Sequence, residues 1–244
     1  TLTQKEKILI IPSSRSEVGG HEDWLNPWGS NINALSFFLD RIGAESNQVV
    51  VRFHPNWGQN VGKSDGESSR RVYKEWCEKN NYYFIDSDEA VSTIGLISNC
   101  DIAILNGGSA AVEAAALGKK VVNLGAAPYK GSSFCINISA PDDIDKFFNS
   151  DNQVSSVRNY QSMMRYVYTA LARFPQFCQF VRASETTTYE AYDGADIKRL
   201  ENIILSGEIE ADDEDFADTD ADELEVAELL ECRDWSALSA LAEE

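Results

Sequence analysis

The stretch DIAILNGGSAAVEAAALGKKVVNL, residues 101–124, decides the fold. It opens with an apolar run at 101–105, turns at a pair of glycines into an alanine-rich segment at 109–117, and ends in a second apolar run at 120–124. The two runs are typical of strands buried on both faces, and the segment between them is typical of a helix. A strand, a helix and a second strand at this spacing predict a crossover between parallel strands.

The same alternation covers the chain before this stretch. Apolar runs predict strands at 7–12, 48–53 and 82–85. Apolar residues at helical spacing predict helices at 30–41, 67–79 and 89–98. On the second of these helices, Val72, Tyr73 and Trp76 are expected to face inward. The sequence therefore predicts the α/β class, a doubly wound parallel sheet of Rossmann type with helices on both faces.

After Asp142 the pattern changes to helices, which are expected at 142–149, 157–174 and 195–205. The sequence therefore predicts three parts: a Rossmann-like domain at 1–150, C-terminal helices packing on it at 151–205, and an acidic tail at 206–244. The tail holds sixteen acidic residues and one arginine, so it carries 15 of the 19 net negative charges. Its apolar residues from 224 to 241 predict one amphipathic helix. Two interpretations of this segment stay open: a solvated tail, or a segment that docks as a helix or mimics a polyanion.

Composition excludes several classes of protein. No stripe of lysine and arginine occurs, and nucleic-acid binding requires clustered cations. The five cysteines are widely spaced without a CxxC pair, which predicts reduced thiols and no zinc site. No apolar stretch is long enough for a transmembrane helix or a signal peptide, so a cytoplasmic location is expected. Because the sequence begins without Met, a piece of a longer chain is one interpretation.

The loop after the strand at 101–105 is the first candidate site. In a parallel sheet, ligands bind beyond the carboxyl ends of the strands. Two glycines let the backbone approach a ligand, and N–H groups at a helix start favour an anion. Glu113 follows on the same helix face, where it could accept both hydroxyls of a ribose. The alternative is a glycine turn with an N-cap serine and an exposed glutamate. The residues expected to bind phosphate here are Asn106, Gly107, Gly108, Ser109 and Ala110.

A second candidate element, Arg-Phe-His-Pro-Asn at 52–56, ends the strand at 48–53. Pro55 fixes the turn, so His54 is expected at the carboxyl edge of the sheet. A histidine there can donate to a phosphate or protonate a leaving group. The alternative is a histidine that only caps the loop. His21, the other histidine, has acidic neighbours, but three close residues are poor grounds for a metal site.

These elements resemble the C-terminal, donor-binding half of GT-B-fold glycosyltransferases, in particular the bacterial capsule and surface-polysaccharide enzymes that include Kdo transferases and sialyltransferases. The shared patterns are a strand with Ser-Ser-x-x-Glu at 10–17, Arg-x-His-Pro-Asn at 52–56, and Gly-Ser-x-x-x-Glu-Ala-x-x-x-Gly-Lys at 108–119. The resemblance spans residues 7 to 180, and it implies that the domain at 1–150 binds a nucleotide sugar. No GxSxG, Walker, GxGxxG or HExxH motif points elsewhere.

The resemblance implies that His54 is catalytic and stabilises a departing phosphate, that Ser109 assists, and that Glu113 holds the ribose. Further nucleotide contacts are expected from Ser13, Ser14, Arg52, Pro55 and Asn56. The reaction would transfer a sugar from a nucleotide donor to a polysaccharide or glycolipid acceptor. A CMP-linked keto sugar is favoured over a UDP-linked one, no metal or other cofactor is required, and the enzyme would work in the cytoplasm or at the inner face of the membrane.

This chain departs from the family because a GT-B enzyme needs a second Rossmann domain, N-terminal to this one, which supplies the acceptor site and usually the catalytic carboxylate. A chain of 244 residues has no room for it. The missing half would belong to a longer chain or a separate subunit. Two other classes stay open: a module that binds a nucleotide sugar or phospho-glycan without catalysis, and a sugar-nucleotide epimerase-like domain.

Overall fold

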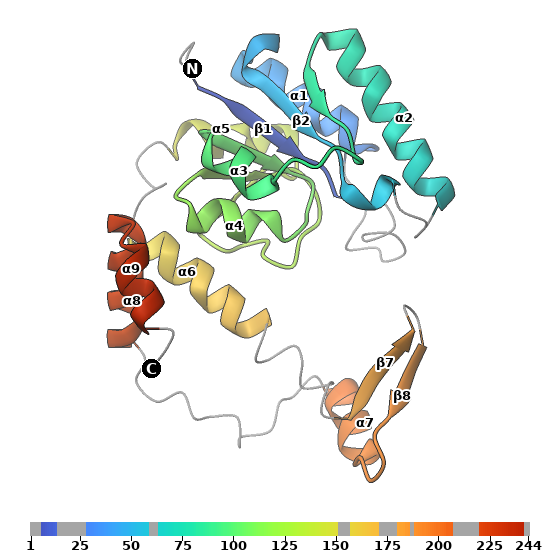
Figure 1. Ribbon diagram of the computed structural model, residues 1–244, viewed down its shortest axis with the longest axis vertical. Helices are drawn as coiled ribbons and strands as arrows, with labels where there is room; N and C mark the ends of the chain where they lie inside the picture. Colours follow the sequence, from blue (N-terminus) through green and yellow to red (C-terminus); the bar gives the residue numbers. More distant parts are fainter. Residues whose placement is uncertain are drawn as a thin grey trace. The chain divides into compact units, whose positions relative to one another are not determined.

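The computed structural model describes residues 6–13, 28–58, 63–150, 157–170, 180–185, 188–206 and 220–241. The chain divides into two compact units, one made of Thr1–Met163 with Ala227–Glu244 and one made of Met164–Val226. The first unit contains a sheet covered by helices (Figure 1). None of the helices in the described ranges combines the length and the apolar composition that crossing a bilayer requires.

The sheet has six parallel strands in the order β3-β2-β1-β4-β5-β6. This is the Rossmann strand order, and it confirms the predicted fold class. The order reverses direction between β1 and β4, so the loops after these two strands lead away from each other and leave a crevice. The strands are β1 (Ile8–Ile11), β2 (Val49–Arg52), β3 (Tyr83–Ile85), β4 (Ile102–Leu105), β5 (Lys120–Asn123) and β6 (Ile136–Asn137).

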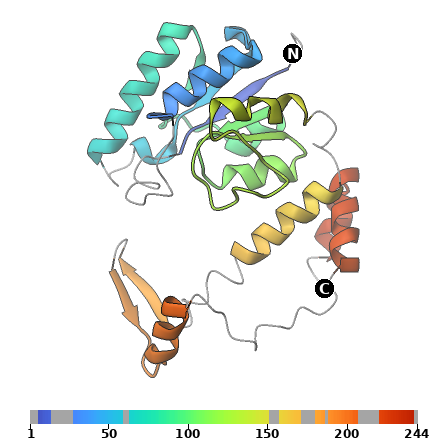
Figure 2. The same cartoon turned by 180° about the vertical axis from the view of Figure 1, so that it is seen from behind.

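Helices cover both faces of the sheet, as expected for buried parallel strands. Figures 1 and 2 show α3 and α4 on one face and α1 and α5 on the other, and α2 joins α1 in the same buried cluster. The helices are α1 (Asn31–Ile42), α2 (Lys63–Asn80), α3 (Thr93–Ser98), α4 (Ala110–Ala116) and α5 (Ile144–Phe148).

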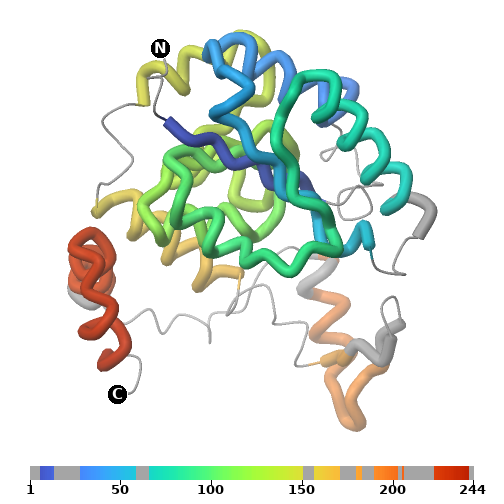
Figure 3. Tube along the Cα trace, turned by 45° about the horizontal axis from the view of Figure 1, so that its top comes forward, coloured from blue at the N-terminus to red at the C-terminus, as the bar shows by residue number. Residues whose placement is uncertain are grey.

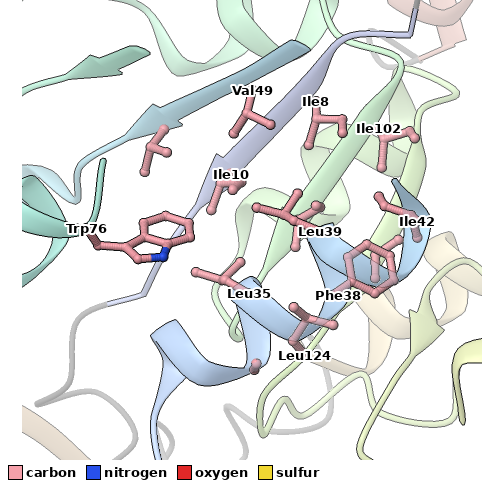
Figure 4. Close-up of a cluster of buried hydrophobic side chains, with 14 of the residues drawn as sticks. Ile8, Ile10, Leu35, Phe38, Leu39, Ile42, Val49, Trp76, Ile102 and Leu124 are labelled. Atoms are coloured by element: carbon pink, nitrogen blue, oxygen red, sulfur yellow. The ribbon is translucent and has the colours of Figure 1, made fainter. Parts of the chain in front are cut away.

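The core forms because apolar residues recur at the period of each element. On α1 the buried residues Leu35, Phe38, Leu39 and Ile42 lie three or four positions apart, on one helix face. Figure 4 shows this face turned toward side chains of β1, β2 and β4. Ser30 caps the helix by accepting the N–H of Asn33 at 3.1 Å.

Two predicted helices differ from the structure. On α2 the buried residues are Tyr73, Trp76 and Cys77, whereas Val72 is 45% exposed, so its predicted inward position is wrong. The buried stripe follows the spacing i, i+3, i+4, and Val72 lies beside it. The helix predicted from residue 89 begins only at Thr93, because Ser92 caps it and accepts the N–H of Gly95.

The short edge strand β6 was not predicted, because its two residues form no apolar run long enough to signal a strand. The helix predicted at 142–149 is confirmed as α5. The helix predicted at 157–174 is α6 (Val157–Tyr168), with residues 171–174 outside the described ranges.

In the second unit, the prediction of helices alone is wrong. An antiparallel hairpin of β7 (Val181–Glu185) and β8 (Thr188–Ala191) precedes α7 (Ile197–Ser206), which matches the helix predicted at 195–205. The helix predicted near the chain end is two helices, α8 (Asp220–Cys232) and α9 (Trp235–Leu241). Arg233, with a positive φ of 56°, lies between them. Most of the acidic segment before α8, residues 207–219, lies outside the described ranges.

Candidate functional site

A pocket lies at the point where the strand order reverses, between the carboxyl ends of β1, β2 and β4. Its volume is about 170 Å³. Open α/β sheets bind ligands at this position. Twelve residues of the first unit line the pocket, and eight of them are predicted site residues: Ser13, His54, Pro55, Gly107, Gly108, Ser109, Ala110 and Glu113. The other four are Ile11, Pro12, Thr93 and Leu105.

Residues 106–110, here called the glycine loop, join β4 to α4 in a conformation that requires glycine. Gly107 and Gly108 have φ values of 101° and 94°, which other residues rarely adopt. A Cβ on Gly107 would also lie 2.7 Å from the carbonyl oxygen of Ala126. Among the described residues, none accepts a hydrogen bond from the N–H groups of Gly108, Ser109 or Ala110.

The peptide between Asn106 and Gly107 is held on both sides by buried side chains. Ser13, at the end of β1, donates its hydroxyl to the carbonyl of Asn106 at 2.8 Å. Asn123, the last residue of β5, accepts the N–H of Gly107 at 2.8 Å. The amide nitrogen of Asn123 in turn donates to the carbonyl of Gly125 at 2.7 Å. The loop is therefore positioned by the ends of both neighbouring strands before any ligand binds.

His54 lines the pocket from the loop that follows β2, and its ring orientation is fixed by the backbone. Its Nδ1 accepts the N–H of Asn56 at 3.2 Å. This hydrogen bond requires that the neutral ring carries its proton on Nε2. A ring in this form can donate Nε2–H to an anion. Pro55, also in the pocket wall, opens the short helical turn Pro55–Gly58 that brings Asn56 back to the ring.

The charge of the pocket is low. Its only ionisable side chains among the described lining residues are His54 and Glu113. Glu113 lies in the first turn of α4 and is half-buried. No lysine or arginine belongs to this lining. The described residues therefore offer a ligand mainly neutral donors, namely backbone N–H groups, hydroxyls and the imidazole.

Three predicted site residues do not line the pocket, and a fourth, Ser14, lies outside the described residues. Arg52 is 5% exposed, and its guanidinium donates to the backbone carbonyls of Asp86 and Glu89, so it holds the loop after β3 instead of lining the pocket. Asn56 contributes its backbone N–H to His54 and does not line the pocket. The Asn106 side chain is buried, and its amide atoms have no hydrogen-bond partner in the described ranges. Ser14 lies outside the described residues, as do His21 and Cys178.

Sequence reasoning missed Thr93 and Asn123. Thr93 lines the pocket from the first turn of α3, whose start was predicted four residues too early. Asn123 belongs to a strand, where an asparagine is unusual, and that was the available signal. Its side chain is only 1% exposed, which a sequence does not reveal.

Three buried cysteines and the arrangement of possible metal ligands can be assessed in the described ranges. Burial raises the pKa of Cys77 and Cys135 to about 12 and that of Cys100 to about 11, so these thiols stay protonated and are weak nucleophiles. No group of three or more His, Cys, Asp or Glu side chains in these ranges is arranged to hold a metal ion.

The sequence matches no protein-family model and no curated protein. In structure, the chain is similar to UDP-GlcNAc 2-epimerase from Neisseria meningitidis, solved bound to UDP-GlcNAc, with a TM-score of 0.39 and 17% sequence identity. The match covers 70% of this chain and 45% of the epimerase, so the chain spans less than half of that enzyme. The assignment to the Rossmann type rests on the strand order and on the helices that cover both faces of the sheet.

Proposed function

We propose that the pocket between β1, β2 and β4 binds the phosphate of a nucleotide-linked sugar, and that the chain is the donor-binding part of a glycosyltransferase. The observation that carries this proposal is the convergence of three elements on one pocket. The glycine loop supplies N–H groups that have no acceptor in the described part of the chain, His54 supplies an oriented imidazole, and Glu113 supplies a carboxylate. In this proposal the glycine loop contacts the phosphate, His54 stabilises the leaving group, and Glu113 binds the ribose.

The phosphate would lie on the glycine loop. Three neighbouring backbone N–H groups that have no acceptor among the described residues, with the hydroxyl of Ser109 beside them, are the donors we assign to the oxygen atoms of a phosphate. The volume of about 170 Å³ is below the roughly 300–1,000 Å³ of sites that enclose a whole small molecule. The described residues therefore enclose the phosphate end of the ligand, and its sugar and base extend beyond them.

The charge of the pocket favours a ligand with one phosphate. A diphosphate brings at least two negative charges and normally requires Lys, Arg or a metal ion to offset them. The described lining contains none of these cations, and Glu113 adds a negative charge of its own. A singly charged phosphodiester, as in a CMP-linked sugar, is easier to accommodate than the diphosphate of a UDP-linked sugar.

His54 would assist the departure of the nucleotide. In the transfer step, the bond between the anomeric carbon and the phosphate oxygen breaks, and the electron pair stays on the phosphate. A hydrogen bond from Nε2–H stabilises the charge that develops there. The acceptor hydroxyl attacks the anomeric carbon and loses its proton to a base. We place that base on a second domain or subunit, in keeping with the GT-B resemblance.

A second candidate function is nucleotide-sugar binding without catalysis. The observation that favours it is the lining itself, because Glu113 is its only carboxylate in the described ranges. If Glu113 holds the ribose, no carboxylate remains in this lining to deprotonate an acceptor. The two functions share the same binding site and differ in turnover.

Isothermal titration of CMP, CDP, UMP and UDP tests the shared site. CMP against CDP compares the number of phosphates at a constant base, and CMP against UMP compares the bases. Ser109→Ala and His54→Ala should each raise the Kd for CMP about tenfold or more, because each removes a hydrogen bond to a charged group. Ser98→Ala is the matched control, since Ser98 is exposed near the end of α3 and its hydroxyl is bonded to Ile94.

Tight CMP binding that both variants weaken, with CDP binding more weakly, supports the proposed site. Tighter binding of CDP than of CMP contradicts the argument from charge. Absence of binding to all four nucleotides contradicts the proposal as a whole. Turnover of a CMP-linked sugar by the isolated chain would exclude the binding-only alternative.

A further inference from the structure

Tyr129 lies under the glycine loop, although it does not line the pocket. Its side chain is 1% exposed and packs against the ring of Phe134 at a centroid distance of 5.7 Å. Its hydroxyl donates to the carbonyl oxygen of Gly108 at 3.1 Å. The residue belongs to the segment between β5 and β6, which follows the carboxyl end of β5.

The carbonyl that Tyr129 holds belongs to the peptide that joins Gly108 to Ser109. The described chain contains no cis peptide bond, so the C=O and N–H of this peptide point in opposite directions. Fixing the carbonyl of Gly108 on Tyr129 therefore turns the N–H of Ser109 away from Tyr129. Ser109 lines the pocket and Tyr129 does not, so that direction leads toward the pocket.

The glycine loop needs such a support. Two successive glycines leave the backbone free to rotate, and a Cβ built on Gly108 would meet only the Cβ of Ser13, at 3.9 Å, among the described residues. Ser13 and Asn123 restrain the peptide before Gly107, at the other end of the pair. A hydrogen bond to the carbonyl also polarises the peptide and strengthens its N–H as a donor.

We propose that Tyr129 is a positioning residue for anion binding: its hydroxyl fixes the Gly108–Ser109 peptide so that the N–H of Ser109 is aimed at the bound phosphate. The inference rests on the proposed function of this pocket. Two different peptides of the loop are therefore fixed by hydrogen bonds. Ser13 and Asn123 bind the peptide between Asn106 and Gly107, and Tyr129 binds the peptide between Gly108 and Ser109.

Tyr129→Phe tests this role because it removes the hydroxyl and keeps the ring that packs on Phe134. The matched control is Tyr160→Phe, which removes the hydroxyl of another buried tyrosine, one that lies at Gly118 and outside the pocket. We would measure the Kd for CMP and for inorganic phosphate, the melting temperature, and the backbone N–H resonance of Ser109 by two-dimensional NMR with and without CMP.

Tyr129→Phe is expected to raise both dissociation constants about threefold to tenfold. The substitution leaves the N–H of Ser109 in place as a donor to the phosphate, but no longer fixes its direction. It should also shift the Ser109 N–H resonance in the ligand-free protein and reduce its further shift on adding CMP. Tyr160→Phe should leave both Kd values and that resonance unchanged. A purely structural role for Tyr129 would change the melting temperature alone.

Each other result has a distinct meaning. If the parent protein binds neither CMP nor phosphate, the proposed function fails and the inference falls with it. If the parent binds them and Tyr129→Phe binds equally well with an unchanged Ser109 resonance, the inference is wrong and the proposed function stands. Failure of Tyr129→Phe to fold would also overturn it, because the residue would then serve the fold.

Discussion

Asn123 uses all of its hydrogen-bonding capacity inside the protein. Its oxygen accepts the N–H groups of Gly107 and Gly125, and its nitrogen donates to the carbonyl of Gly125 and to Asn137. An asparagine amide offers two acceptor and two donor positions, so every position is occupied. Removing this side chain leaves several buried polar groups without partners, which costs more than the bonds contribute when formed.

Asn123→Ala should therefore lower the free energy of unfolding by about 2–3 kcal/mol. Chemical denaturation followed by circular dichroism measures this difference. The control is Asn80→Ala, because Asn80 makes one hydrogen bond, to the carbonyl of Trp76, at the end of α2; its cost should stay below about 0.5 kcal/mol. An equal loss of unfolding free energy in the two variants would show that the buried hydrogen bonds of the Asn123 amide do not stabilise the fold more than one surface hydrogen bond does.

At the residue scale, the sequence predicted which residues gather at the pocket better than it predicted where long side chains point, and the roles of these residues stay predictions. His54, Ser109 and Glu113 line one pocket because each follows a strand at the carboxyl edge, and that edge is predictable from alternation. Arg52 also ends a strand, yet its guanidinium turns to two carbonyls of the loop after β3. Which way a long side chain turns depends on contacts across the chain, and no local pattern encodes them.

Among the elements, α1 and α4 end in the same way but differ in what surrounds their ends. Gly43 follows α1 with a φ of 71°, and a Cβ there would meet nothing within 4 Å. Gly118 follows α4 with a φ of 64°, and a Cβ there would lie 2.8 Å from the hydroxyl of Tyr160 on α6. Both glycines end their helices in the left-handed conformation, but only the second also allows a close contact.

Gly118→Ala is thus expected to cost more stability than Gly43→Ala. Each substitution places alanine at a positive φ, at about 1 kcal/mol, and Gly118→Ala adds the steric conflict with Tyr160. In the double variant Gly118→Ala with Tyr160→Phe, removal of the hydroxyl should recover the additional cost. Thermal unfolding of the parent, Gly43→Ala, Gly118→Ala and the double variant measures these differences. A double variant no more stable than Gly118→Ala alone would contradict the proposed contact.

The connection from β3 to α3 is anchored to α2 by an ion pair. The Nε of Arg70 lies 2.6 Å from a carboxylate oxygen of Asp86. Burial of the Asp86 carboxyl opposes ionisation, but hydrogen bonds from Arg70 and from the N–H of Ser87 outweigh it and lower the pKa of Asp86. A carboxyl with a lower pKa in the folded than in the unfolded state stabilises the fold above its unfolded pKa.

Asp86→Asn should therefore reduce stability at pH 7, and the difference should shrink as the pH falls below about 4 and through the lower pKa of the folded state. Because the Arg70 side chain is 34% exposed, solvent screens the pair, and the expected loss is about 0.5–1 kcal/mol. Urea unfolding from pH 7 down to pH 3 measures it. Asp88→Asn is the control, since Asp88 pairs with the same Arg70 at 3.1 Å but is 65% exposed, so its loss should cost less than that of Asp86. A deficit of Asp86→Asn that was as large at pH 3 as at pH 7 would mean that the ion pair is not its cause.

The elements show where sequence patterns are sufficient. Five of the six strands of the parallel sheet were predicted because they are apolar runs that end in turn residues. β6 was missed because two residues carry no periodicity, and its place is set by pairing with β5. The hairpin β7–β8 was missed for a related reason, since a strand pair is stabilised by cross-strand contacts that no single segment displays.

For the whole molecule, the division into units could not be predicted from composition. The acidic residues suggested that the chain after 205 is a tail, but residues from Ala227 onward belong to the first unit. Ala227 is fully buried and Leu230 is 8% exposed. Figures 1, 2 and 3 all show α8 beside α6. Burial raises the pKa of Tyr160 on α6, and Arg233 and Glu231 lie close enough to affect it.

Leu230→Asp should therefore destabilise the first unit, although Leu230 lies in the most acidic part of the chain. A carboxylate in place of a buried leucine loses apolar burial and must be desolvated, at about 2–4 kcal/mol. Leu241→Asp introduces the same charge at a leucine that is 38% exposed, so it controls for added repulsion in a chain with a net charge of −19. Melting curves of the two variants in low and high salt separate the effects, because salt screens repulsion between exposed charges and leaves the loss of packing. If both variants melt alike, the chain end is held to α6 by no specific packing; if only Leu230→Asp melts early at both salt concentrations, the acidic end of the chain is part of the folded unit that carries the pocket.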